Sequence, residues 1–171
     1  MNKTEPIKCQ DRSIHILFVD DDSDLVALMK SILERLGYIV TSAYNGIDAI
    51  KLIEKYHDVF DVMITDYYMP GMNGIELAKL AGKISNDTPI ILYTGNFYMI
   101  DEQQINEAKI VDVVVKPCKI QDLDAVIKRV FNENLEATQE NKEFRRRTKP
   151  IEILAGEENG GFNSIHKETA N

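Results

Sequence analysis

Two stretches decide the fold of this chain: ILFVDDD at residues 16–22 and DVMITDYYMPGMNGIEL at residues 61–77. Each places a short apolar run directly before an aspartate, Asp20 in the first and Asp66 in the second. Apolar runs this short and this continuous are typical of strands buried on both faces, as in a parallel sheet. The two stretches therefore predict buried parallel strands with acidic residues at their carboxyl ends.

The same pattern repeats along the chain between residues 14 and 131. Short apolar runs at 14–19, 38–43, 62–65, 90–93 and 112–115 predict strands. Between them, apolar residues at helical spacing predict helices, with the least regular pattern at 101–108. In the first helix we expect one apolar stripe of Leu25, Leu28, Met29, Ile32 and Leu36, with Asp22 or Ser23 at its start and Gly37 after its end.

Five β–α repeats with short connections predict a doubly wound α/β fold, because parallel strands need crossovers and crossovers are right-handed. We expect a flexible segment over residues 1–12, one domain over 13–132, and an extension over 133–171. The extension is poor in large apolar residues. Its first part can continue the fifth helix toward Arg147, Pro150 should stop that helix, and the remainder is predicted to be disordered.

Composition narrows the class of protein. Of 171 residues 44% are hydrophobic, enough for a core, and a net charge of −8 argues against a nucleic-acid-binding surface over the whole chain. No apolar run approaches the roughly 20 residues of a membrane-spanning helix. The N-terminus lacks the pattern of a secretory signal, and two cysteines, Cys9 and Cys118, agree with a reducing compartment. We therefore expect a soluble cytoplasmic protein without membrane insertion.

Polar residues follow four of the predicted strands. Asp20 and Asp21 follow the first, Asp66 the third, Thr94 the fourth and Lys116 the fifth. Ligands of open α/β sheets bind at the carboxyl ends of the strands, so these side chains should converge. Gathered carboxylates favour a hard cation such as Mg²⁺, and a hydroxyl and an ammonium suit phosphoryl oxygens. Because a carboxylate can act as a nucleophile, the set predicts a phosphoryl-transfer site.

The blocks ILFVDDD, DVMITDYYMPGMNGIEL, ILYTGN and VVVKP, in this order, resemble the signature blocks of response-regulator receiver domains of two-component systems. The resemblance covers about residues 14–131. It implies the strand order 2-1-3-4-5. It also implies a phosphoacceptor signalling protein that promotes only its own phosphorylation and dephosphorylation, not an enzyme acting on external substrates.

Carried over residue by residue, the resemblance implies that Asp66 is the phosphoacceptor and that Thr94 and Lys116 bind the phosphoryl group. Asp66 and Asp21 would ligate Mg²⁺ with the backbone carbonyl of Tyr68, and Asp20 would act largely through water. The peptide bond between Lys116 and Pro117 is expected to be cis. Asp22 has no family role and is interpreted as a helix-start acid.

The resemblance also implies partners. A sensor histidine kinase or a histidine phosphotransfer protein would supply the phosphoryl group, and a downstream protein would bind the face formed by helix 4, strand 5 and helix 5. Many receivers carry an aromatic residue three positions before the strand-five lysine, but this chain has Val113 there. That difference puts the usual threonine–aromatic coupling in doubt. A homodimer stays open, although Leu135 and Phe144 make only a thin seam on an extended fifth helix.

Parts of the sequence also fit two other functional classes. A DNA-binding transcription regulator could use RRR at 145–147 and Lys149, but nearby glutamates and the ordinary preference for cations at a helix end weaken this interpretation. A phosphatase of the haloacid-dehalogenase type needs a second acid two residues after the nucleophile, where this chain has Tyr68. We offer the hypothesis that Tyr68 shields an acyl phosphate on Asp66 from water.

Overall fold

The computed structural model describes residues 13–56, 59–85, 87–95 and 100–147, with side chains described up to residue 139. The predicted flexible segment over 1–12 and the predicted disordered part of the tail lie outside these residues. Strands and helices alternate along the chain: β1 (His15–Val19), α1 (Ser23–Arg35), β2 (Ile39–Ala43), α2 (Gly46–Lys55), β3 (Val62–Thr65), α3 (Gly74–Ile84), β4 (Ile90–Thr94), α4 (Glu102–Glu107), β5 (Ile110–Val115) and α5 (Ile120–Arg147).

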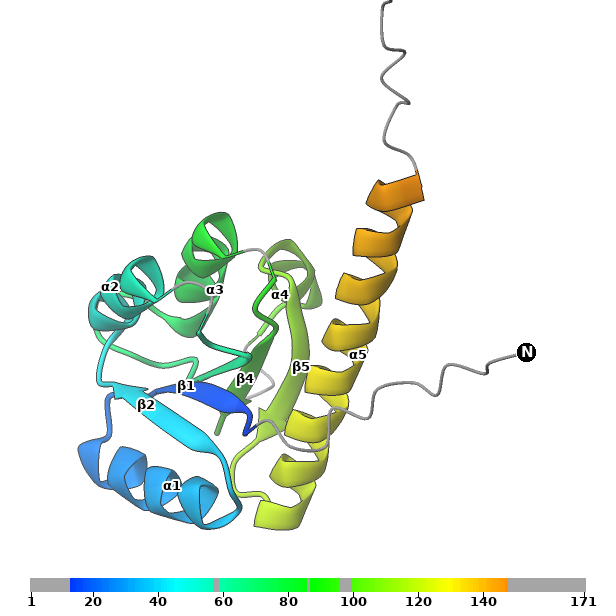
Figure 1. Ribbon diagram of the computed structural model, residues 1–171. Coiled ribbons are helices and arrows are strands. Elements are labelled where there is room, and N and C mark those ends of the chain that lie inside the picture. Colours follow the sequence, from blue (N-terminus) through cyan, green and yellow to red (C-terminus); the bar gives the residue numbers. More distant parts are fainter. Residues whose placement is uncertain (1–12, 57–58, 86, 96–99, 148–171) are drawn as a thin grey trace, which may run out of the picture.

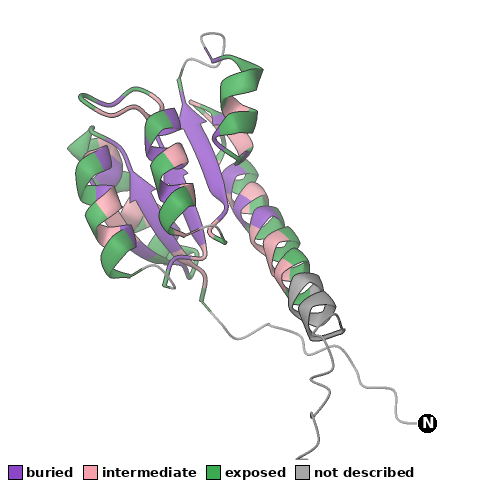
Figure 2. Ribbon diagram, turned by 90° about the horizontal axis from the view of Figure 1, so that it is seen from above, coloured by how far each residue is buried: buried purple, intermediate pink, exposed green. Residues whose placement is uncertain are grey.

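The strands form one parallel sheet in the order β2-β1-β3-β4-β5, which confirms the predicted fold class. Helices cover both faces: α1 and α5 lie on one side of the sheet, and α2, α3 and α4 on the other (Figure 1). Each face packs its own buried cluster, one lined by Ile53, Leu77 and Ala81 and the other by Met29, Leu123 and Ile127. Figure 2 shows the strands almost wholly buried between helices whose outer faces are exposed.

The predicted apolar stripe of α1 is partly wrong. Leu28 and Leu36 are 57% and 46% exposed, whereas Val26, Met29 and Leu33 face the core. Apolar residues are so frequent in this helix that two stripes of similar quality exist, and only packing against the sheet selects one.

Polar side chains and a glycine cap the helix ends. The side chain of Asp22 accepts hydrogen bonds from the backbone N–H groups of Asp24 and Leu25, so Asp22 is the N-cap of α1. Gly37, after that helix, has φ = +94°, a left-handed conformation that glycine adopts without steric cost. Asn73 begins α3 through a capping box. Helix starts are thereby fixed just beyond the strand ends that carry the acidic residues.

Strand β5 begins at Ile110, two residues before the predicted start. The pairing with β4 shifts between Ile90 and Ile91, so that Val111 is an extra residue on β5 and is 51% exposed. Asp112 follows the shift and pairs with Arg129 of α5. A bulge of this kind interrupts the alternation of buried and exposed positions, which is why the apolar pattern concealed the start of the strand.

Helix α5 continues to Arg147, as predicted, and runs well past the edge of the sheet (Figures 1 and 2). Its first half is held by the buried side chains Leu123, Ile127 and Val130. Farther along, the amide of Asn134 donates a hydrogen bond of 2.8 Å to the backbone carbonyl of Asp87. Within the described residues, none of the helices combines the length and apolarity needed to cross a membrane.

Candidate functional site

The four predicted strand ends lie at one edge of the sheet. Asp20 follows β1, Asp66 follows β3, Thr94 ends β4 and Lys116 follows β5, and these strands are neighbours in the sheet. Two backbone hydrogen bonds continue the strand pairing up to the site. The N–H of Asp66 donates to the carbonyl of Val19 at 2.9 Å, and the N–H of Lys116 donates to the carbonyl of Thr94 at 2.8 Å. The sheet itself therefore fixes where these side chains begin.

Lys116 joins the two buried carboxylates. Its Nζ lies 2.7 Å from Oδ2 of Asp20 and 2.7 Å from Oδ1 of Asp66. The Asp20 and Asp66 side chains are only 3% and 10% exposed, so these charge-assisted hydrogen bonds are poorly screened by solvent. The Lys116–Pro117 peptide bond is cis, as expected from the resemblance.

The remaining carboxylate oxygens accept backbone hydrogen bonds. Oδ2 of Asp66 accepts from the N–H of Tyr68 at 2.5 Å, and Oδ1 of Asp20 accepts from the N–H of Asp22 at 2.9 Å. Each carboxylate is thus oriented by one backbone donor and by one shared ammonium. This arrangement holds the Asp66 carboxylate in a defined direction, as a nucleophile requires.

The buried position of Asp66 disfavours the charged form of its carboxylate. Burial raises its pKa, the hydrogen bond and the charge of Lys116 oppose that rise, and the nearby Asp20 charge adds to it, leaving the pKa above its usual range. For Lys116, burial disfavours the ammonium, but the hydrogen bonds and charges of Asp20 and Asp66 outweigh burial and raise its pKa. One cation is therefore shared by carboxylates that together exceed it in charge.

This excess of negative charge fits a hard divalent cation. Among the described residues, no group of three His, Cys, Asp or Glu side chains is arranged to hold a metal. Mg²⁺, however, commonly takes only one or two carboxylates and completes its octahedron with water, carbonyl and phosphate oxygens. Asp20 and Asp66 supply two such carboxylates, and both side chains lie at the same buried edge, where they share the single Lys116 ammonium.

The other predicted site residues lie at this edge with less defined roles. Asp21 is exposed, directly after Asp20 at the start of the loop that leads to α1. Thr94 is 1% exposed, and its carbonyl accepts the Lys116 N–H bond. Tyr68 is 57% exposed, with its ring edge-on to Tyr67 at 4.8 Å between centroids. The roles of these residues remain predictions.

Three residues at the site were not found from the sequence. A Cβ on Gly74 would collide with the carbonyl oxygen of Asp66, so α3 can begin there only with glycine. Thr65 Oγ1 donates to that same carbonyl at 3.0 Å. The ring of Tyr93 lies 4.9 Å from Nζ of Lys116. Of these three residues, only Gly74 gives a sequence signal, because the Asn–Gly pair at 73–74 is typical of a tight turn.

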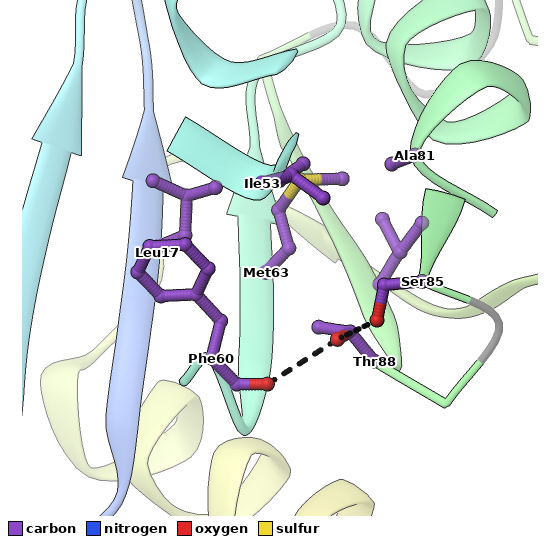
Figure 3. A pocket seen from close by; sticks show the side chains of 8 residues that line it. Leu17, Ile53, Phe60, Met63, Ala81, Ser85 and Thr88 are labelled. Atoms are coloured by element: carbon purple, nitrogen blue, oxygen red, sulfur yellow. Dashed lines mark hydrogen bonds between the residues drawn. The ribbon is translucent and has the colours of Figure 1, made fainter. Parts of the chain in front are cut away.

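A small cavity lies at the opposite, amino-terminal end of the strands (Figure 3). It measures about 10 Å³, and six of its eight lining residues are apolar. Thr88 Oγ1 donates to the carbonyl of Phe60 at 3.2 Å and lies 2.9 Å from Ser85 Oγ, so these polar atoms satisfy one another. Space for about one water-sized sphere holds no organic ligand, so this cavity is not a candidate ligand site.

The strand order and the acid–ammonium cluster at the carboxyl edge define an open α/β domain with a candidate phosphoryl-binding site. The chain belongs to the response regulator receiver domain family, whose model matches residues 16–128. It is therefore a receiver domain of two-component signalling.

Two curated relatives illustrate the family. The chain is 25% identical over 158 residues to transcription factor SKN7 of Saccharomyces cerevisiae, an alignment that covers 92% of this chain and 25% of the relative. It is 34% identical over 116 residues to a CpxR homologue of Haemophilus influenzae, covering 68% of this chain and 49% of the relative. The chain thus spans only part of the curated relatives that it matches.

Three solved structures share this fold, and two of them contain magnesium. A CheY-like receiver from Methanospirillum hungatei superposes with a TM-score of 0.69 at 28% identity, covering 74% of this chain and 99% of that one. A response regulator of Thermotoga maritima, in complex with Mg²⁺ and BeF, gives 0.62 at 30% identity, with 68% and 98% covered. A Pseudomonas aeruginosa histidine-kinase receiver with magnesium in its active-site cleft gives 0.64 at 25% identity, with 71% and 99% covered.

Proposed function

We propose that this chain is a single-domain response regulator that accepts a phosphoryl group on Asp66 and switches its protein contacts in response. The observation that carries the proposal is Lys116, whose ammonium lies 2.7 Å from Asp66 and 2.7 Å from Asp20. A buried carboxylate beside an ammonium at a strand end is a nucleophile with a charge partner for the group that it will carry.

In the proposed reaction, an Asp66 carboxylate oxygen attacks the phosphorus of a phosphohistidine in line. The P–N bond breaks and its electron pair returns to the imidazole of the donor. Bound Mg²⁺ would supply charge neutralisation on the phosphoryl oxygens, held by Asp20, Asp21 and Asp66 with the Tyr68 carbonyl. Lys116 and Thr94 would bind the phosphoryl oxygens, and hydrolysis of the acyl phosphate would return the domain to its starting state.

The proposed output surface is the face of α4, β5 and α5. Within the described residues, α4 has no fully buried side chain, and only Ile105 packs partly buried against the core. Val111 and Val115 of β5 are 51% and 47% exposed, so apolar surface is available for a partner. Because Val113 replaces an aromatic residue here, we propose that the response of this face does not depend on rotation of a strand-five ring.

We further propose that residues 13–132 form the receiver unit and that residues from 133 onward extend it. The domain is proposed to act in the cytoplasm as a phosphoacceptor without turnover of external substrates. Its phosphoryl donor would be a sensor histidine kinase or a histidine phosphotransfer protein.

The test is phosphorylation of the purified chain by acetyl phosphate with Mg²⁺, followed by phosphate-affinity electrophoresis. We expect the wild type and Asp48→Asn, which changes an exposed acid on α2, to be labelled alike, and Asp66→Asn or chelation of Mg²⁺ to abolish labelling. A wild type that takes no label, or an Asp66→Asn variant that still does, contradicts the proposal. Transfer from a cognate kinase, again absent in Asp66→Asn, would identify the donor.

A further inference from the structure

Tyr93 is a buried aromatic residue beside the site that the reaction above does not use. It precedes Thr94 in β4, is 6% exposed, and packs in the core between the sheet and helices α1 and α5. Its ring contacts Phe18 of β1 edge to face, with centroids 6.4 Å apart. Neighbouring strands therefore hold the ring in a fixed place.

The face of this ring lies against the ammonium that joins the two carboxylates. Nζ of Lys116 is 4.9 Å from the ring centroid, while the same atom donates to Asp20 and Asp66. The negative face of an aromatic ring attracts a cation at this distance, and more strongly where water is excluded. The Lys116 side chain is only 20% exposed, so the contact lies largely away from solvent.

The hydroxyl of Tyr93 has a separate partner. Cys118, two residues after Lys116, places Sγ 4.0 Å from the Tyr93 hydroxyl oxygen and donates to it. The Tyr93 side chain thus contacts the loop after β5 twice, through its ring at Lys116 and through its hydroxyl at Cys118. The ring face alone, however, touches the ammonium.

We propose that Tyr93 is a positioning residue for phosphoryl transfer, whose ring face holds the Lys116 ammonium where it can bind a phosphoryl oxygen on Asp66. This inference rests on the proposed function. A lysine side chain has several rotatable bonds, and its ammonium must exchange a carboxylate partner for the phosphoryl group. Because the ring is uncharged, it attracts the ammonium without competing for the phosphoryl group or adding charge.

The test measures initial phosphorylation rates over a range of acetyl phosphate concentrations at saturating Mg²⁺. Tyr93→Leu removes the ring face, and we expect the maximal rate to fall about three- to tenfold. Tyr93→Phe keeps the face and should restore most of that rate. Tyr38→Leu is the matched control, because Tyr38 is also 6% exposed and belongs to the same cluster, and it should phosphorylate like the wild type.

A double-mutant cycle separates positioning from general damage. If Tyr93 acts through Lys116, then Tyr93→Leu should slow the reaction no further in a Lys116→Ala background. Thermal unfolding establishes that each variant is folded, and Tyr93→Met, which also lacks the ring, replaces Tyr93→Leu if that variant fails to fold. Additive effects of the two substitutions, or an equal loss in Tyr38→Leu, overturn the role of Tyr93. A wild type that takes no label overturns the proposed function itself, and with it this inference.

Discussion

The backbone of Gly74, at the first residue of α3, lies so close to the carbonyl oxygen of Asp66 that no side chain fits between them. The N–H of Gly74 also donates to the carbonyl of Tyr67 at 3.0 Å. These contacts tie the start of α3 to the segment that carries the candidate phosphoacceptor. The geometry of the acidic edge therefore depends on a residue that has no side chain.

Gly74→Ala should destabilise the domain and disturb Asp66 together. The added methyl group would meet backbone, which moves less readily than a flexible side chain, and we expect a loss of about 1–3 kcal/mol in the free energy of unfolding. Gly82→Ala in the same helix is the matched control, since nothing lies within 4 Å of its Cβ position. That change should stabilise by up to about 1 kcal/mol. Denaturant unfolding measures both, and equal effects would contradict the contact.

The capping box of α3 gives a second prediction. The Asn73 side chain accepts from the N–H of Glu76 at 2.9 Å, and the Glu76 carboxylate accepts from the N–H of Asn73 at 3.0 Å. Asn73→Ala should lower the free energy of unfolding by about 1 kcal/mol. Glu76→Gln keeps an acceptor and should cost less. If denaturant unfolding shows a larger loss of stability for Glu76→Gln than for Asn73→Ala, the capping box does not stabilise α3 in this way.

Much of this architecture could be predicted because buried parallel strands and short connections leave few alternatives. The four strand-end residues converge simply because β1, β3, β4 and β5 are neighbours in the sheet. The face of α1 could not be settled from the sequence, because Leu28 and Val26 offered rival stripes. The contact of Tyr93 with Lys116 could not be predicted, because the sequence of a buried strand does not indicate which charged group a tyrosine ring will face.

Lys116→Met should weaken the protein in the absence of Mg²⁺. It leaves Asp20 and Asp66 buried without their cation, and we expect a loss of about 1–3 kcal/mol in the free energy of unfolding. Lys128→Met is the control, because Lys128 pairs with Asp124 at 2.8 Å on the surface, with its own side chain 58% exposed. Exposed pairs contribute about 0–1 kcal/mol.

Mg²⁺ should recover more stability in Lys116→Met than in the wild type, because the ammonium no longer occupies the carboxylates. Thermal unfolding with and without the ion measures this difference. A smaller Mg²⁺ effect in Lys116→Met than in the wild type would show that Lys116 does not compete with the ion for Asp20 and Asp66.

Alkaline pH should affect stability through Tyr93. Burial, followed by the neighbouring Cys118 and then the Asp20 charge, raises the pKa of Tyr93 from 10.0 to about 12. A group whose pKa is higher in the folded state binds its proton more tightly there, so its contribution is complete below pH 10 and is lost between pH 10 and about 12. Tyr93→Phe should lose less stability over this window than the wild type, as measured by denaturant unfolding. Equal losses would place the Tyr93 pKa near its ordinary value.

The proposed boundary of the receiver unit can be tested by shortening α5. The hydrogen bond from Asn134 to Asp87 lies beyond Val130, which is 2% exposed and is the last buried apolar residue of the helix among those whose side chains are described, up to residue 139. A chain that ends after Ala137 keeps both contacts and should match the full chain to within about 0.5 kcal/mol, since surface changes away from such contacts have small effects. A chain that ends after Lys128 loses Val130 and the Asn134 bond and should be less stable by about 2–4 kcal/mol. If shortening to Ala137 already costs that much, the extension is part of the folded unit and the proposed boundary is wrong.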